Sequence, residues 1–217
     1  MKSTQEITHD TYENPAVVQK YIEANTNNKK LEIYMEEVSH LIKGKNLIDM
    51  GCGPGHDSYF FAGLGFNVIG VDYSSEMIKQ ANIFKIIDNK PKFEQLDMRE
   101  VGNRFEKDQF DAAWINSSLI HIQEQDVPNV LEGVRKIVKN GGKVFIFLKS
   151  GEQGPQFIKE NKYIEGIERE FIFWEKDKFI NLAKEYNFVL ENLIEEAHGI
   201  TNGKTTHWIN FTFEIVK

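Results

Sequence analysis

Three glycines at alternate positions, Gly51, Gly53 and Gly55, follow a short apolar run and precede a predicted helix. Because glycine has no Cβ, the backbone can turn sharply at these positions and a ligand can approach it closely. The first turn of the following helix offers unpaired N–H groups and a partial positive charge, which suit a carboxylate or another anion. This segment therefore predicts a ligand-binding turn between a strand and a helix.

The spacing of these glycines favours some ligands over others. The fingerprint of nicotinamide and flavin sites is G-x-G-x-x-G, and the place of its third glycine is taken here by His56. An acid, Asp49, stands shortly before the first glycine instead. A nicotinamide-dependent oxidoreductase is therefore disfavoured, and no pyrophosphate need be held by this turn.

Two further acids follow predicted strands. Asp72 ends the second predicted strand, about 20 residues after the glycine turn, where an acid of a doubly wound fold accepts hydrogen bonds from both ribose hydroxyls. Asp97 and Met98 follow the third strand, where the acid can accept from an adenine amino group while the methionine packs on the ring. The alternative for both acids is an exposed carboxylate at a turn.

The elements expected around these residues alternate between short apolar runs and longer amphipathic ones, which is typical of parallel β-α-β units. Predicted helices lie near 14–25, 29–43, 56–64, 124–139 and 175–186, with one more around Met77. Predicted strands are Asn46–Met50, Asn67–Val71, Lys92–Leu96, Phe110–Asn116, Lys143–Leu148 and a run near 188–194. Residues 150–156 are expected to form a surface loop.

The end of the chain predicts an antiparallel hairpin. Asn202-Gly203 is the preferred pair for a tight hairpin turn, because both positions tolerate a positive φ. After it, apolar side chains alternate with others from Ile209 to Ile215, a period of two that indicates a strand. We therefore expect an α/β fold, Rossmann-like and doubly wound, with a mostly parallel seven-stranded sheet that ends in this hairpin.

With these residues in place, the chain resembles the class I S-adenosyl-L-methionine (SAM)-dependent methyltransferases, of the type-11, type-25 or tellurite-resistance-like group that acts on small molecules. The motifs that carry the resemblance are Asp49–Gly55, Val71–Met77, Leu96–Met98, the segment from Phe110 to His121, and Asn140–Gly142, in which Asn140 replaces the usual proline. The resemblance covers roughly residues 10–217. It is specific for the fold and the cofactor, and unspecific for the methyl acceptor.

The resemblance implies SAM as cofactor and S-adenosyl-L-homocysteine as product. Asp72 would bind the ribose, Asp97 and Met98 the adenine, and Asn116 the methionine part, with Asp49 near the amino end of the cofactor. The residues predicted to bind the cofactor are Asp49, Gly51, Cys52, Gly53, Asp72, Tyr73, Met77, Asp97, Met98, Asn116 and Ser117. The alternative for Asp49 is a brace of the turn, and we interpret Cys52 as a small buried residue rather than a nucleophile.

Two histidines are candidates for the catalytic base. His121 follows the fourth strand at the topological switch point, where it would act as a general base or bind the substrate. His207, in the terminal strand, is the second candidate. The alternative for His121 is a helix-capping or solvated histidine, and for His207 a structural role.

Aromatic side chains are candidates for the walls of an acceptor pocket. Trp208 lies in the terminal strand, and Trp174 and Tyr163 lie in an expected substrate-side insert at 150–174. The resemblance implies that residues 1–43 form a helical lid, in which Tyr12 and Tyr21 would bind the substrate. Packing in the core or on the flank of the sheet is the alternative for these side chains.

Composition limits the function further. A length of 217 residues with 41% apolar residues predicts a single domain, 1–217, with its own core. A net charge of −7 and a pI near 5.5 make nucleic acid an unlikely partner. One cysteine forms no internal disulfide, no apolar stretch predicts a signal or a membrane span, and no ligand cluster predicts a metal, so we expect a cytoplasmic protein, monomer or homodimer.

These features together predict a SAM-dependent methyltransferase that transfers a methyl group to a small-molecule O, N or S acceptor by in-line displacement. Since the leaving sulfur becomes neutral, the main tasks of the protein are alignment and exclusion of water. Asn116–Leu119 lacks the N-P-P-Y motif of planar-nitrogen methyltransferases, which disfavours such acceptors. The alternatives are an RNA or protein methyltransferase, expected to show a broad basic face, and a non-catalytic SAM-binding regulatory subunit, expected to lack an acceptor pocket.

Overall fold

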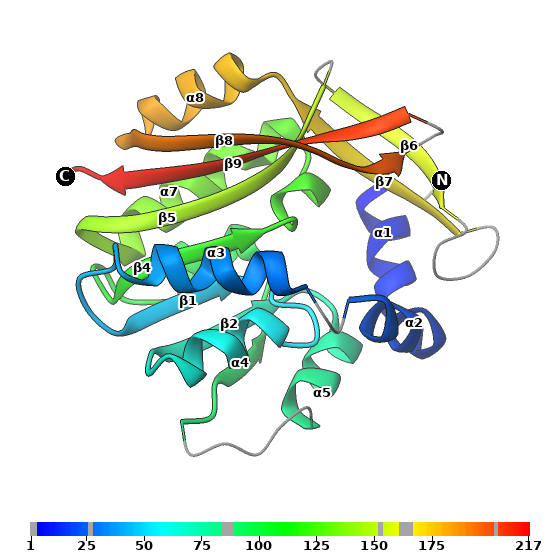
Figure 1. Cartoon of the computed structure of the whole chain (residues 1–217), viewed down its shortest axis with the longest axis horizontal. Helices are drawn as coiled ribbons and strands as arrows, with labels where there is room; N and C mark the ends of the chain where they lie inside the picture. The colour runs from blue at the N-terminus through cyan, green and yellow to red at the C-terminus, as the bar shows by residue number, and fades with distance from the viewer. Residues whose placement is uncertain (1–3, 26–27, 84–88, 152–153, 161–166, 202–203) are drawn as a thin grey trace.

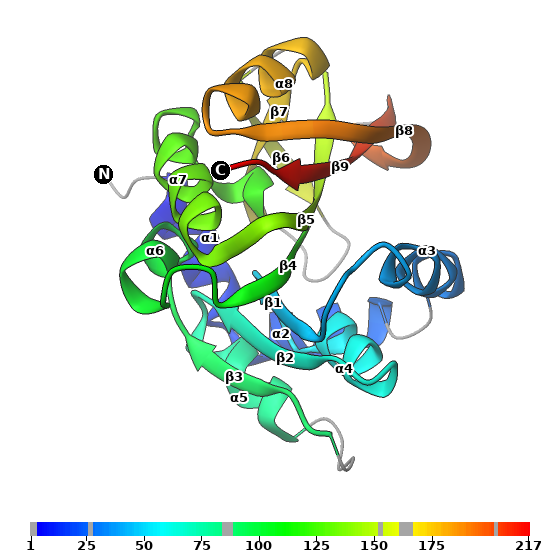
Figure 2. The ribbon, with the colours of Figure 1, turned by 90° about the vertical axis from the view of Figure 1, so that its left-hand side faces the viewer.

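The computed structural model describes residues 4–25, 28–83, 89–151, 154–160, 167–201 and 204–217. In these residues a twisted sheet runs through the molecule and carries helices on both faces (Figures 1 and 2). Its strands are β1 (Asn46–Met50), β2 (Asn67–Asp72), β3 (Lys92–Gln95), β4 (Phe110–Asn116), β5 (Val138–Ser150), β6 (Gly154–Glu160), β7 (Ile167–Trp174), β8 (Phe188–Thr201) and β9 (Lys204–Ile215). The helices are α1 (Thr4–Tyr12), α2 (Pro15–Asn25), α3 (Lys29–Ser39), α4 (His56–Gly63), α5 (Ser75–Ile83), α6 (Val101–Arg104), α7 (Val127–Ile137) and α8 (Lys176–Glu185).

The sheet is doubly wound, as predicted, with β3, β2, β1, β4 and β5 as successive neighbours that all pair in parallel. On the other side of β5, β9 pairs antiparallel with both β5 and β8. The order reverses between β1 and β4, so a crevice is expected at the carboxyl ends of these two strands. The predicted fold class, a mostly parallel sheet closed by an antiparallel hairpin, is confirmed.

The number of strands differs from the prediction, because the sheet in the described part of the chain has nine strands instead of seven. The two additional strands, β6 and β7, form an antiparallel hairpin that joins the end of β5 at Lys149 and Ser150. Much of the loop expected at 150–156 is therefore strand, since β6 begins at Gly154. The Asn202-Gly203 turn and Tyr163 lie outside the described residues.

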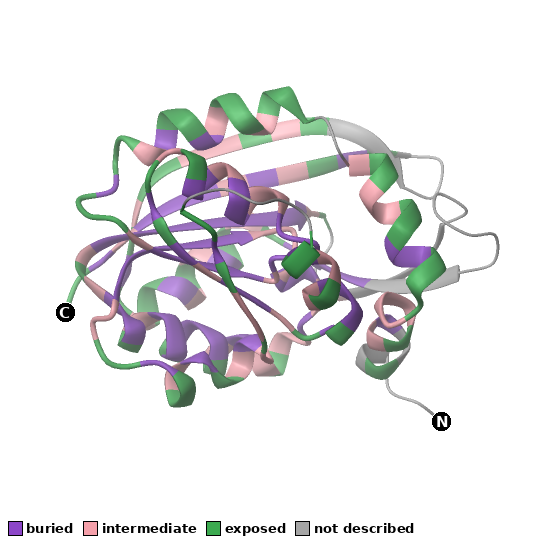
Figure 3. Ribbon diagram, turned by 90° about the horizontal axis from the view of Figure 1, so that it is seen from below, coloured by how far each residue is buried: buried purple, intermediate pink, exposed green. Residues whose placement is uncertain are grey.

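Two apolar clusters fill the space between the sheet and its helices, one on each face. Side chains alternate along β4, so that Ala113 and Ile115 lie in one cluster while Ala112 and Trp114 lie in the other. The central strands are buried along most of their length (Figure 3). Because β4 is buried on both faces, the backbone at its carboxyl end is fixed, and so are the positions from which its polar side chains extend.

The N-terminal helices differ in number and length from those expected. Helix α2 occupies the span near 14–25 that was predicted, α1 precedes it as a helix that was not predicted, and α3 ends at Ser39 rather than at 43. Pro15 is the first residue of α2. Because a proline disfavours helical geometry at the residue before it, Asn14 separates α1 from α2. The Asn14 side chain then accepts from the Ala16 N–H at 3.0 Å. Among the described residues, no helix combines the length and the apolar character needed to cross a membrane.

Candidate functional site

The glycine turn is attached to the neighbouring strand β2 by its backbone. The N–H groups of Gly51 and Cys52 donate to the Val71 carbonyl at 2.7 and 3.0 Å. Gly51 has a φ of +76°, and a Cβ at this position would lie 2.2 Å from the Cβ of Ser118. Only glycine fits here, because both the dihedral angle and the contact with Ser118 exclude a side chain.

Gly53 faces open space instead. Its φ is +52°, and a Cβ built there would meet its nearest neighbour, Met77 Sδ, only at 3.9 Å. A side chain at Gly53 would therefore project into the cavity above the turn. The missing Cβ leaves room for a ligand to lie directly against the backbone.

Asp72 lies at the end of β2 and braces this turn. Its Oδ2 accepts from the Gly53 N–H at 2.8 Å, and its Oδ1 accepts from the Ser74 N–H at 2.9 Å. Burial raises the pKa of the Asp72 carboxyl, while these two backbone hydrogen bonds act in the opposite direction. Each carboxylate oxygen keeps a lone pair, so the side chain can accept two more hydrogen bonds from the cavity.

Asp97 is held by a cation that the sequence analysis did not single out. Arg99 donates from Nε to both carboxylate oxygens at 3.0 Å, and its backbone N–H reaches Oδ1 at 2.9 Å. The same guanidinium contacts Asp126 at 3.2 Å. These contacts raise the pKa of Arg99 and fix the direction of the Asp97 side chain.

Asp49 is buried beneath the glycine turn. The Ser58 hydroxyl donates to its Oδ2 at 2.6 Å. Burial raises the pKa of Asp49 well above its usual value, and the nearby Asp57 and Asp72 carboxylates raise it further. Asp49 is not among the described residues that line the cavity.

The end of β4 supplies Asn116, Ser117 and Ser118 to the cavity. The Ser118 hydroxyl donates to the Met50 carbonyl at 2.6 Å, which ties the end of β4 to the end of β1. Ser117 has a φ of +55°, a left-handed conformation that few residues other than glycine adopt. This turn thus brings three consecutive polar residues to the edge of the cavity.

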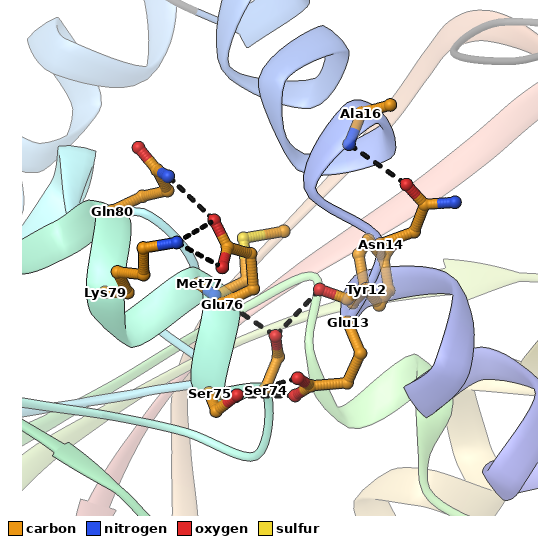
Figure 4. Close-up of polar contacts among 10 residues, drawn as sticks. All are labelled: Tyr12, Glu13, Asn14, Ala16, Ser74, Ser75, Glu76, Met77, Lys79 and Gln80. Carbon is orange, nitrogen blue, oxygen red and sulfur yellow. Dashed lines mark hydrogen bonds and ion pairs between the residues drawn. The ribbon is translucent and has the colours of Figure 1, made fainter.

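Helices α1 and α2 cover the opposite side. Tyr12 packs edge-on against His121 with ring centroids 5.7 Å apart, and against Tyr21 at 6.1 Å. The turn after α1 contacts the start of α5, where the Ser74 hydroxyl donates to the Tyr12 carbonyl at 2.8 Å (Figure 4). The Glu13 carboxylate accepts from the N–H and the hydroxyl of Ser75 at 2.6 and 2.7 Å. Helix α3 packs on the sheet instead, so of the described residues in the expected lid, those in α1 and α2 reach the cavity.

The two sides border a cavity of about 840 Å³, counting the part that opens to solvent. Predicted residues that line it are Gly51, Gly53, Asp72, Tyr73, Met77, Asp97, Met98, Asn116, Ser117, Tyr12, Tyr21 and His121. Lining residues that the sequence analysis missed are Thr8, His9, Ser74, Leu96, Ser118 and Ile122. Most of these are neighbours of predicted residues, and their proximity in the chain is the signal that was available.

Besides Asp49, four predicted residues lie elsewhere in the described part of the chain. Cys52 is buried inside the turn, where burial raises the pKa of its thiol well above the usual value. Trp174, on β7, is buried against Phe179 with ring centroids 5.1 Å apart. Trp208, on β9, packs near Lys149, whose Nζ lies 5.3 Å from its ring, and His207 is exposed. None of the four lines the described cavity.

Comparison with known proteins gives a match over the region that carries this turn. Residues 47–142 match the family model described as a methyltransferase domain. The ubiquinone biosynthesis O-methyltransferase of Paraburkholderia phymatum is 32% identical over 113 residues, which are 52% of this chain and 47% of the relative. Phosphoethanolamine N-methyltransferase 1 of Zea mays is 31% identical over 136 residues, 58% of this chain and 26% of the relative. The chain thus spans less than half the length of these two curated relatives.

A solved structure extends the likeness to the whole chain. Phosphoethanolamine N-methyltransferase 2 of Haemonchus contortus, in complex with phosphomonomethylethanolamine and S-adenosylhomocysteine, superposes with a TM-score of 0.77 at 16% identity. The superposition covers 100% of this chain and 61% of the other. The family-model match agrees with the predicted resemblance over residues 47–142, and the superposition confirms the predicted fold.

Proposed function

Residues 47–142 belong to the methyltransferase domain family, and from this premise we propose that the chain transfers the methyl group of SAM to a small-molecule O, N or S acceptor. One observation carries the proposal. The strand ends with Gly53, Asp72 and Asn116 and the helices with Tyr12 and Tyr21 enclose one cavity. This arrangement provides a cofactor site on one side and a covered acceptor site on the other.

The residues on the strand-end side fit SAM part by part. Asp72 has two lone pairs left for the ribose hydroxyls after it binds Gly53 and Ser74. Met98 and Leu96 give an apolar surface beside Asp97 for the adenine. The open space over Gly53 accommodates the amino-acid part, next to Asn116.

His121 and Tyr12 are placed to act on the acceptor. SAM, when bound, supplies an electrophilic methyl group on a cationic sulfur. The protein must align the acceptor atom with that methyl group and limit the access of water, and α1 and α2 shield part of the cavity from solvent. The His121 ring packs against Tyr12, and its centroid lies 5.0 Å from that of the Phe171 ring. If the acceptor atom must lose a proton, His121 takes it. His207 stays a second candidate for this proton, from an exposed position on β9.

Three observations favour a small molecule as the acceptor. Helices α1 and α2 line one side of the cavity through Tyr12 and Tyr21, which narrows the approach for a nucleotide or side chain within a macromolecule. The curated relatives are named for ubiquinone biosynthesis and for phosphoethanolamine, which are small molecules. The net charge of −7 also disfavours nucleic acid.

Calorimetry with SAM and with S-adenosylhomocysteine tests the cofactor. We expect the Asp72→Ala variant to bind both ligands more weakly by about 1–3 kcal/mol, because it loses charge-assisted hydrogen bonds. Equal affinities of wild type and variant would refute the ribose assignment.

Turnover tests the acceptor side. Incubating the purified protein with SAM and a metabolite pool, and searching for a mass gain of one methyl group, identifies the acceptor. With that acceptor, His121→Ala should slow turnover by about 10²-fold if His121 is the base. A near-normal rate in this variant would mean that another group acts as the general base.

A further inference from the structure

Asp57, in the first turn of α4, makes contacts that helix stability alone does not require. An acid in this position interacts favourably with the helix dipole, and a solvated side chain would suffice for that. Its Oδ2 instead reaches across to β4, where it accepts from Trp114 Nε1 at 2.8 Å and from Asn116 Nδ2 at 2.9 Å. The carboxylate thus joins the helix that follows the glycine turn to the strand whose end lines the cavity.

The pairing of the strands explains why these two donors converge. Side chains two residues apart on a strand share a face, so Trp114 and Asn116 both point toward α4. Trp114 is fully buried and packs against Phe61 at 5.1 Å and Phe147 at 4.8 Å, which holds its indole N–H in place. Since β1 and β4 pair with Asp49 opposite Trp114, Asn116 comes level with the glycine turn.

The contact with Asp57 determines the orientation of the Asn116 amide. A carboxylate only accepts hydrogen bonds, so the amide must turn its NH₂ group toward Asp57. The Ser117 hydroxyl donates to the other end of the amide, Oδ1, at 3.0 Å. One lone pair of Oδ1 then remains for a donor in the cavity, beside Gly51 and Gly53.

The charge of this region favours a cationic donor at that lone pair. Asp49, Asp57 and Asp72 surround the glycine turn, and Asp57 lies directly behind the amide. A carboxylate behind an amide increases the negative character of its carbonyl oxygen, and charge-assisted hydrogen bonds are the strong ones. The amino-acid end of SAM carries an ammonium group, which is a donor of this kind.

We propose that Asp57 is a positioning residue for the amino-acid end of the cofactor, because it keeps the Asn116 carbonyl oxygen available to a cationic amino group. This inference rests on the proposed function and adds a residue to the same site. Asp57 touches no ligand itself and acts through Asn116.

Two ligands distinguish this role from a structural one. S-adenosylhomocysteine has the amino-acid end, whereas 5′-methylthioadenosine has the same adenosine and thioether without it. We expect Asp57→Ala to weaken binding of S-adenosylhomocysteine by about 10- to 100-fold, and to change binding of methylthioadenosine by less than about 3-fold. Calorimetry on the full chain measures both.

Two further variants keep the test decisive. Asp57→Asn keeps the shape of the side chain and one acceptor oxygen, so the ratio of the affinities for S-adenosylhomocysteine and methylthioadenosine should fall less than in Asp57→Ala. This variant still tests the inference if Asp57→Ala fails to fold. Trp114→Phe removes the other donor to Asp57 and should leave the ratio as in wild type. If all variants weaken both ligands alike, or the ratio stays constant in Asp57→Ala and Asp57→Asn, the inference is overturned. A wild type that binds neither ligand overturns the proposed function as well.

Discussion

The two sides of the cavity are built in different ways. The strand-end side follows β1, β2 and β4, and Asp72 and Ser118 there bond to the backbone of neighbouring elements. The other side, α1 and α2, is largely exposed, with Thr8, Val17 and Val18 as its buried side chains among the described residues. Its turn meets the start of α5 through Tyr12 and Glu13 (Figure 4).

We infer from this difference that the strand-end side recognises the ligand, whereas the α1–α2 side controls access to the cavity. The strand-end side needs no ligand to form, because buried strands and backbone hydrogen bonds hold it in place. The α1–α2 side is attached by the polar contacts of its turn, by the Tyr12–His121 ring contact and by the packing of α1 on β7. Its own buried side chains, Val17 and Val18, belong to neither apolar cluster, so this side can open while the sheet stays folded. We therefore expect substitutions on the strand-end side to change global stability, and substitutions on the α1–α2 side to change mainly opening.

The largest effect is expected at Gly51. A Cβ there would lie 2.2 Å from the Ser118 Cβ at a φ of +76°, so Gly51→Ala should lower the free energy of unfolding by about 2–4 kcal/mol. Gly63→Ala is the matched control, since nothing lies within 4 Å of its added Cβ and its φ is negative. We expect it to change stability by no more than about 1 kcal/mol. Urea unfolding of both variants makes the comparison, and similar losses would contradict a preformed strand-end side.

A smaller effect on stability is expected at Asp49, and it depends on pH. The folded state raises the pKa of this carboxyl above its usual 3.8, so the native protein holds the proton more tightly than the unfolded chain. The stability from this group is therefore complete below the usual pKa and decreases as pH rises toward the folded-state pKa. Asp49→Asn removes this loss and can still accept from Ser58. In urea unfolding, the free energy of unfolding of the variant relative to wild type should increase from acidic to neutral buffer. A difference between the two proteins that does not depend on pH would argue against a buried charge at Asp49.

The smallest effect is expected at Glu13. Glu13→Gln keeps the shape of the side chain and removes its charge from the start of α5, which should weaken this contact by about 0.5–1 kcal/mol. Backbone amides of α1 and α2 should then exchange with solvent about 3- to 5-fold faster, while global unfolding stays nearly unchanged. Hydrogen exchange with mass detection measures both.

A surface acid serves as the control for Glu13. Glu132 pairs with Arg135 on α7, remote from the α1–α2 turn, so Glu132→Gln should leave exchange of α1 and α2 unchanged. Equal acceleration by both substitutions would mean that net charge, rather than the Glu13 contact, governs opening.

Local patterns were sufficient for most of the fold. The glycine turn, the alternation of strands with helices and the terminal period of two predicted the sheet and its antiparallel end, because each depends on dihedral preferences and periodicity within a few residues. The hairpin of β6 and β7 was missed, since it gains its place by pairing with β5 at Lys149 and Ser150. Such pairing leaves no local mark in the sequence.

The same division runs through the site. Sequence alone determined which residue types stand at the strand ends, since Asp72, Asp97 and Asn116 each follow a recognisable strand. Only the tertiary structure decided the distant partners of the site residues, such as Asp57 on Asn116 and Tyr12 over His121. The physical reason is reach: a strand-end position follows from neighbouring residues, whereas a hydrogen bond between residues as distant in sequence as Asp57 and Asn116 exists only after β1, β4 and α4 have packed together.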